Sequence, residues 1–147
     1  VYIKEGKKIK IETSVKNMLK NEEKFGIKKF KTYQDFGKKV YKIRANVIKN
    51  LKELKKKNSL VVGYGAPAKA TTALNFFGVS NEIDFIVEDN ILKHNKFVPG
   101  VKIPIKKKSD IKNKDNTVVV LAWNFFQDIK NNNRTLSKKF VSIKDLE

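Results

Sequence analysis

The sequence of 147 residues has no cysteine, three prolines and a single histidine. Without cysteine it has no disulfide framework, no cysteine-ligated zinc site and no thiol chemistry. Its apolar runs are shorter than the ~18 residues of a membrane span, and its start lacks the pattern of a secretory signal peptide. We therefore expect a cytoplasmic protein without membrane association. Because the first residue is Val1 rather than Met, we also expect a piece of a larger protein.

Acidic residues and arginine are scarce as well. The chain carries 33 basic and 15 acidic residues, a net charge of +18, but only Arg44 and Arg134 are arginine. Such a surface attracts polyanions. Nucleic-acid sites favour arginine, however, and the excess falls from +13 over residues 1–60 to +5 over residues 61–147. We therefore expect a solvated lysine surface, with nucleic-acid binding as a less favoured alternative.

The first 58 residues have the patterning of a helical segment. Residues 1–4 favour a short strand, and residues 15–25 favour a helix with Ser14 as its N-cap and Gly26 at its end.

A longer helix is predicted over residues 33–57, with Thr32 as its N-cap. Its apolar residues recur three or four apart and share one face: Phe36, Val40, Ile43, Val47, Leu51 and Leu54.

After residue 59 short apolar runs alternate with helical patterns. Strands are predicted over residues 59–65, 82–88, 103–105, 117–123 and 139–143, and helices over residues 66–77 and 124–131. This alternation is typical of a parallel sheet with right-handed crossovers. The sequence thus predicts an α/β fold: a Rossmann-like parallel sheet of about four strands in residues 59–147, after a helical N-terminal region in residues 1–58.

A glycine-rich turn follows the first of these strands. The run from Gly63 to Ala68 fits G-x-G-x-x-A, in which Gly63 permits a tight turn and Gly65 a close approach to a ligand. Ala68 is expected to let the helix pack near the strand. The N-terminus of that helix favours an anion, which also accounts for Lys69 in its first turn. A tight turn without a ligand is the alternative.

Further polar side chains are expected at the same edge of the sheet. Glu88 ends the second strand, where a dinucleotide-binding fold places its ribose-binding carboxylate. An NAD-type oxidoreductase domain is therefore a second candidate, although Pro67 removes one N–H from the turn. His94 is a loop residue or a base, and Asn124 a helix cap or a ligand contact. The side chains of Lys69, Lys93, His94 and Lys96 are expected to converge on a phosphate-rich ligand.

Several motifs in register carry a family resemblance. They are Gly63–Phe77, Phe85–Asn90, Lys93-His94, Pro99–Ile105 and Leu121–Phe125. Together they resemble the C-terminal domain of S-adenosylmethionine-dependent sugar C-methyltransferases, which methylate a carbon of a nucleotide-linked deoxyketosugar. The first residues, Val1 to Ile3, are similar to the last strand of the preceding methyltransferase domain in that family.

The resemblance implies a zinc-binding N-terminal segment, a methyltransferase domain that binds S-adenosylmethionine, and this Rossmann-like domain. We expect this chain alone to be inactive, to bind no metal or cofactor, and to contribute no catalytic residue. It is expected to bind the diphosphate of a nucleotide-linked sugar against the missing methyltransferase domain. The residues carried over as substrate contacts are Gly63, Tyr64, Gly65, Ala66 and Lys69, together with Glu88, His94 and Asn124.

Overall fold

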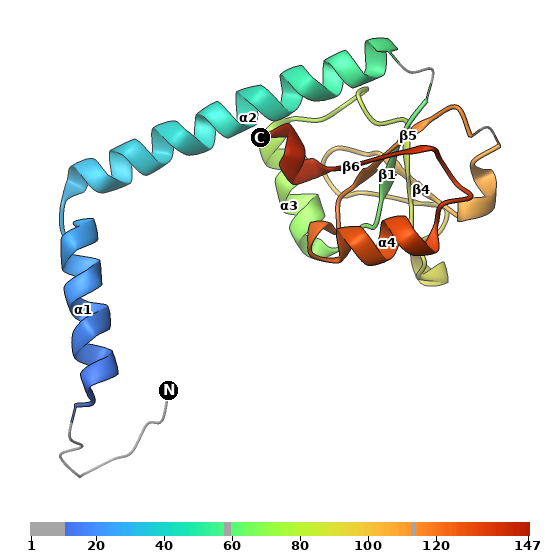
Figure 1. The fold of residues 1–147 in the computed structure, drawn as a ribbon. Helices are drawn as coiled ribbons and strands as arrows, with labels where there is room; N and C mark the ends of the chain where they lie inside the picture. Colours follow the sequence, from blue (N-terminus) through green and yellow to red (C-terminus); the bar gives the residue numbers. More distant parts are fainter. Residues whose placement is uncertain (1–10, 58–59, 113) are drawn as a thin grey trace. The chain divides into compact units, whose positions relative to one another are not determined.

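The computed structural model describes residues 11–57, 60–112 and 114–147 (Figure 1). The chain forms two compact units, residues 1–40 and residues 41–147. The strand predicted over residues 1–4 lies outside the described residues. So does the predicted domain boundary at residues 58 and 59, which stays a prediction.

The first unit contains α1 (Thr13–Phe25) and the start of α2 (Phe30–Lys57). Gly26 ends α1 as predicted: it has a φ of 80°, and its N–H donates to the carbonyl oxygens of Glu22 and Glu23. Only glycine adopts this left-handed conformation without strain.

Both predicted N-caps in this unit are wrong. Ser14 lies inside α1, and its hydroxyl donates to the carboxylate of Glu12 at 3.3 Å. Thr32 lies inside α2, which begins at Phe30, and its hydroxyl donates to the carbonyl oxygen of Gly26 at 2.8 Å. Thr32 therefore stabilises the connection between the two helices rather than the start of the second.

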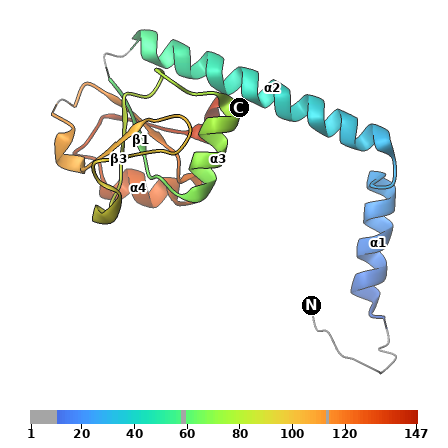
Figure 2. The same ribbon diagram turned by 180° about the vertical axis from the view of Figure 1, so that it is seen from behind.

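The second unit is built on a six-stranded sheet. Its strands are β1 (Val61–Tyr64), β2 (Phe85–Val87), β3 (Lys96–Phe97), β4 (Pro104–Lys106), β5 (Thr117–Val120) and β6 (Lys139–Ser142). They lie in the order β3-β4-β2-β1-β5-β6, and all neighbours are parallel except β3 and β4. The predicted α/β class is confirmed, with more strands than the four expected. The strand β3, at one end of this order, is labelled in the view from behind (Figure 2).

One face of the sheet packs against the second part of α2 and against α3 (Ala68–Phe77). Val47 and Leu51 of α2 are fully buried there, beside Val61 and Ile86 of the sheet. Burial of side chains of this size contributes roughly 1.5–3 kcal/mol each. The apolar face predicted for the long helix is thus confirmed where the helix lies against the sheet.

The other face packs against α4 (Phe126–Asn132). Successive strand residues point to opposite faces, so Val62 and Tyr64 lie in this second core. Phe126 and Ile129 of α4 pack against it. Figure 1 shows α4 beside the sheet. Every residue of β1 and β5 is buried, which explains why both sequences are mostly apolar and do not alternate with polar residues.

Among the residues described, none of the helices combines the length and apolar character that crossing a bilayer requires.

Candidate functional site

A pocket of about 330 Å³ lies where β1, β2 and β5 end. Its lining residues come from these strand ends and from the segments that follow: Tyr64, Gly65, Pro67, Glu88, Asp89, Lys93, Ala122, Phe125 and Ile129. Open parallel sheets bind ligands at the carboxyl ends of their strands. Of the residues predicted as substrate contacts, Tyr64, Gly65 and Glu88 line this pocket, and so does Lys93 of the predicted lysine group.

The two glycines of the turn have different roles. Gly65 has a φ of +85°, and its N–H donates to the carbonyl oxygen of Val87 at 2.8 Å. Gly63 lies within β1, where a Cβ would come 2.7 Å from Cγ1 of Ile86 and 3.1 Å from Cδ1 of Leu121. The predicted turn role of Gly63 is therefore wrong: close packing of the sheet requires glycine there.

The start of α3 also differs from the expectation. Pro67 is extended, with φ −72° and ψ 162°, so α3 begins at Ala68. Ala68 is exposed, whereas Ala70 is buried against the sheet. The small residue that lets this helix approach the strands is thus Ala70, not Ala68.

The carboxylate of Glu88 lies against the glycine turn. One of its oxygens accepts the backbone N–H of Ala66 at 2.8 Å, and the same oxygen lies 3.3 Å from Nζ of Lys93. Its other oxygen accepts the backbone N–H groups of Asp89 and Asn90 at 2.9 and 3.2 Å. Four donors therefore surround one carboxylate, which fills the positions that a ribose hydroxyl needs for binding there.

These donors determine the charge state of Glu88. Burial opposes ionisation, but the N–H groups of Ala66 and Asn90 and the ammonium group of Lys93 outweigh it. The pKa of Glu88 is consequently lowered from its ordinary value of 4.5. Glu88 is an internal anion at the turn.

Two residues of the following loop hold this arrangement. Nζ of Lys93 donates to the carbonyl oxygen of Ala66 at 3.0 Å as well as approaching Glu88. Nε2 of His94 lies 2.7 Å from the carbonyl oxygen of Glu88, the geometry of a donated hydrogen bond. His94 thus holds the end of β2 and lies outside the pocket lining.

Tyr64 belongs to a second charged cluster on the pocket wall. Its ring is buried, and its hydroxyl donates to the carboxylate of Asp89 at 2.8 Å. Nζ of Lys108 lies 2.6 Å from Asp89 and 5.2 Å from the centre of the Tyr64 ring. Burial raises the pKa of Tyr64 above 10.0, so the phenol is neutral at physiological pH.

Lys69 and Asn124 lie beside the pocket rather than in its lining. Nζ of Lys69 lies 4.4 Å from the ring centre of Trp123, a cation–π contact at the start of α3. Asn124 is exposed in the 3-10 turn Trp123–Phe125 and caps no helix. Lys96 lies in the edge strand β3. The side chains of Lys69 and Lys93 contact different groups, so the expected convergence of lysines on a ligand stays a prediction.

Sequence reasoning missed Asp89, Lys108 and Phe125 as parts of this region. Lys108 follows β4 just as Glu88 follows β2, so the strand-end rule could have identified it. Phe125 precedes α4 and remains exposed while it lines the pocket. No motif in the sequence marks it as different from a core aromatic residue.

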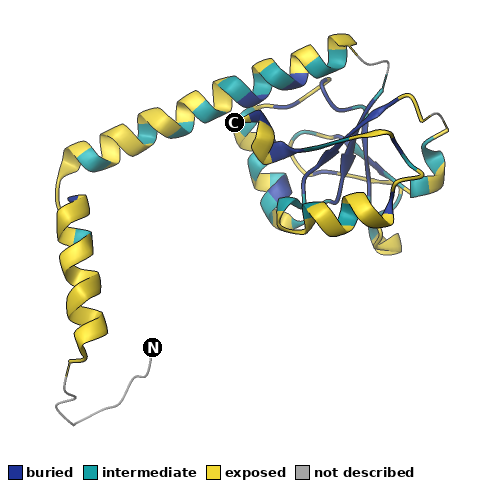
Figure 3. Cartoon of the chain, in the orientation of Figure 1, coloured by how far each residue is buried: buried dark blue, intermediate teal, exposed yellow. Residues whose placement is uncertain are grey.

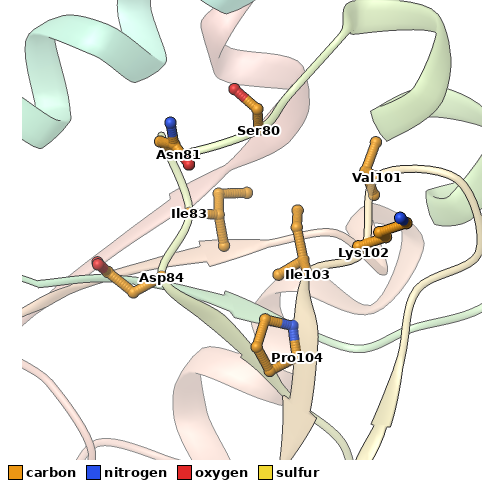
Figure 4. A pocket seen from close by; sticks show the side chains of 8 residues that line it. All are labelled: Ser80, Asn81, Ile83, Asp84, Val101, Lys102, Ile103 and Pro104. Carbon is orange, nitrogen blue, oxygen red and sulfur yellow. The ribbon is translucent and has the colours of Figure 1, made fainter.

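A second pocket, of about 440 Å³, lies near the amino ends of β2 and β4 (Figure 4). Ile83 and Ile103 face it, and Ser80, Asn81 and Lys102 lie around them. The carboxylate of Asp84 is already bound by Nζ of Lys55 and by the backbone N–H of Val61. This pocket lies away from the glycine turn.

The fold and the pocket define an α/β domain with a mostly parallel sheet and a pocket at the carboxyl ends of its strands, and comparisons with known proteins specify its class. Residues 1–142 match the model of the C-methyltransferase C-terminal domain, and the chain belongs to this family. Among its relatives is the C-methyltransferase NovU of Streptomyces niveus, 29% identical over 126 residues. The aligned part covers 84% of this chain and 30% of that relative.

Proposed function

We propose that this chain is the substrate-binding C-terminal domain of an S-adenosylmethionine-dependent C-methyltransferase that acts on a nucleotide-diphosphate-linked sugar. The pocket at the ends of β1, β2 and β5 would receive the nucleotide part of that substrate. The observation that carries this proposal is that Pro67, the N-cap of α3, lines the pocket, so the N-terminus of α3, with Lys69 in its first turn, adjoins it. A cytoplasmic location is part of the same proposal.

The internal anion at Glu88 specifies where a diphosphate would lie. Because Glu88 occupies the N–H of Ala66, the phosphates would bind one step further along, at the N–H groups of Ala68 and Lys69. These two groups have no acceptor within the helix. The helix dipole and the Lys69 ammonium group both favour an anion there.

The aromatic residues beside the pocket suit the base of the nucleotide. Phe125 lines the pocket with an exposed ring, and such rings stack on nucleobases. Trp123 holds the side chain of Lys69 by its ring face. A nucleotide would therefore contact an aromatic residue with its base and a lysine with its phosphates.

The same geometry disfavours the NAD-type alternative. A dinucleotide site needs a carboxylate that is available to the ribose hydroxyl. In this chain the Glu88 carboxylate is bound by Ala66, Asp89 and Asn90 of its own backbone. Pro67 additionally supplies no N–H to a pyrophosphate.

In this proposal the domain contributes binding and orientation. S-adenosylmethionine, bound by a separate methyltransferase domain, supplies the methyl group. Binding of the remote diphosphate positions the acceptor carbon of the sugar for transfer, which is the use that enzymes make of non-reacting parts of a substrate. The chain alone is then expected to bind nucleotides but to transfer no methyl group.

Calorimetric titration with uridine and thymidine diphosphates tests this proposal. We expect dissociation constants in the micromolar to millimolar range that persist at physiological salt. Lys69→Ala should weaken binding about tenfold, because a charge-assisted contact is lost. Lys102→Ala, which changes a lysine at the other pocket, should leave binding unchanged. Binding that disappears at physiological salt would instead indicate non-specific attraction of polyanions.

A further inference from the structure

The first unit exposes many large apolar side chains. In α1 no residue is buried, and Met18 and Phe25 are 65% and 73% exposed. In α2 the same holds for Phe30, at 75%, and for Tyr33 and Phe36. Exposed apolar patches of this kind mark interaction sites in soluble proteins. Most of α1 is drawn in yellow, the colour of exposed residues (Figure 3).

The apolar residues of α1 share one side of the helix. With about 100° between successive residues, Val15, Met18, Leu19 and Phe25 fall within an arc of about 120°. Lysines occupy the opposite side, at Lys16, Lys20 and Lys24. This segregation is typical of a helix that is covered on one side.

The apolar face of α2 continues towards the N-terminal part of this helix. Val47 and Leu51 lie on one helical face and are fully buried in the core of the second unit. Counting back by three or four residues, the same face carries Val40, Phe36 and Tyr33 in the first unit. Phe36 and Tyr33 are exposed there. The apolar face of α2 therefore includes residues whose side chains are exposed in the described part of the first unit.

A helix such as α1 needs a partner to be stable. It has 13 residues, no buried side chain and no side-chain N-cap. Isolated helices of this length are marginal in water even with favourable sequences. Hence α1 needs packing beyond what the described residues of the first unit supply.

We propose that the apolar stripe formed by Val15, Met18, Leu19, Phe25, Phe30, Tyr33 and Phe36 is the surface on which the catalytic portion of the C-methyltransferase polypeptide packs. This inference rests on the proposed function. The family is by description a C-terminal domain, and the aligned part makes up only 30% of NovU. A large folded portion of such a polypeptide therefore needs a contact surface, and the stripe holds half of the large apolar residues that are exposed in the described part of the chain.

The bend between α1 and α2 gives this surface a specific feature. A hollow of about 280 Å³ is lined by the apolar residues Leu19 and Ile27 and by two acidic and two basic residues, Glu22, Glu23, Lys20 and Lys28. The partner is consequently expected to insert an apolar side chain between charges of both signs.

Amide hydrogen exchange over residues 13–36 tests the docking surface. It is measured in the intact C-methyltransferase polypeptide and in the chain of 147 residues alone. We expect exchange at least tenfold slower in the intact polypeptide. Met18→Glu there should return exchange to the rate of the isolated chain, whereas Asn17→Glu, an exposed position on the opposite side of α1, should not.

Several outcomes would overturn the inference. Equal exchange in the two proteins would mean that the catalytic portion does not cover the stripe. Protection that rises with the concentration of the isolated chain would mean that a second copy covers it. Exchange in β1 and β5 reports whether each variant is folded. Titration of the same samples with uridine diphosphate separates the two proposals. Absence of nucleotide binding would contradict the proposed function but would not contradict the docking surface.

Discussion

The carboxylate of Glu88 accepts the backbone N–H of Ala66 at 2.8 Å and so connects the end of β2 to the turn after β1. An N–H group at such a turn is an anion-binding group. In this chain its anion is a side chain of the same domain. The contact joins the two neighbouring strands at the edge where the pocket lies, and it directs any bound phosphate towards Ala68 and Lys69.

Glu88→Gln should lower the free energy of unfolding by about 1–3 kcal/mol. The amide leaves one of its flanking N–H donors without an acceptor and removes the charge beside Lys93. Urea unfolding followed by circular dichroism measures the loss. Glu53→Gln, at an exposed position of α2, is the matched control and should change stability by less than about 0.5 kcal/mol. Equal losses in the two variants would show that the contact does not stabilise the domain.

The stability of the domain should fall on acidification. The pKa of Glu88 is lower in the folded chain than its ordinary value of 4.5, so the stabilisation is complete above that value. It disappears as the pH falls from 4.5 through the lower pKa of the folded state. Unfolding curves recorded at successively lower pH, starting above 4.5, should show this decline. In Glu88→Gln the decline should be shallower, and an unchanged pH dependence would contradict the assignment.

Two glycines should respond to alanine in opposite directions. Gly63→Ala places a methyl group 2.7 Å from Ile86 and should cost about 1–3 kcal/mol. Gly37→Ala places it in open space in the middle of a helix and should stabilise by about 0.5–1 kcal/mol. Thermal unfolding of both variants measures the difference. A neutral Gly63→Ala would show that β1 and β2 can separate to accept the methyl group.

Nucleotide binding should change the fluorescence of Trp123, which is the one tryptophan of the chain. The ammonium group of Lys69 lies 4.4 Å from its ring, so a phosphate that attracts this group alters the surroundings of the indole. Titration with thymidine diphosphate should shift or quench the emission. In Lys69→Gln the response should be lost, and an equal response would mean that the ligand does not engage Lys69.

Much of the sheet could be predicted from the sequence because its central strands are buried on both faces. Runs such as Val61–Tyr64 and Thr117–Val120 consist mostly of apolar residues and contain no charge, and burial explains both. β3 was missed because it has two residues, both exposed, and is defined by its hydrogen bonds to β4 rather than by composition. Edge strands of this length have no signature of their own.

The position of the candidate site could be predicted from the sequence, but the hydrogen-bond partners of its residues could not. The spacing from the glycine turn correctly predicted that Glu88 lies at the end of the second strand. Spacing alone cannot predict which donors will form hydrogen bonds with its carboxylate. Its partners Ala66 and Lys93 come from two different segments, and only the folded backbone brings them together. Gly63 was misread for a similar reason, since the neighbour that excludes a Cβ is Ile86 of another strand.

The most direct test of the central claim is to map nucleotide binding by nuclear magnetic resonance. The isotope-labelled chain is titrated with uridine diphosphate, and the shifts of backbone amides are followed residue by residue. We predict the largest changes at Gly65, Ala68, Lys69 and Phe125, around the pocket at the carboxyl ends of the strands. Changes confined to Ser80–Asp84 and Val101–Pro104, around the other pocket, or no changes at millimolar ligand, would contradict it.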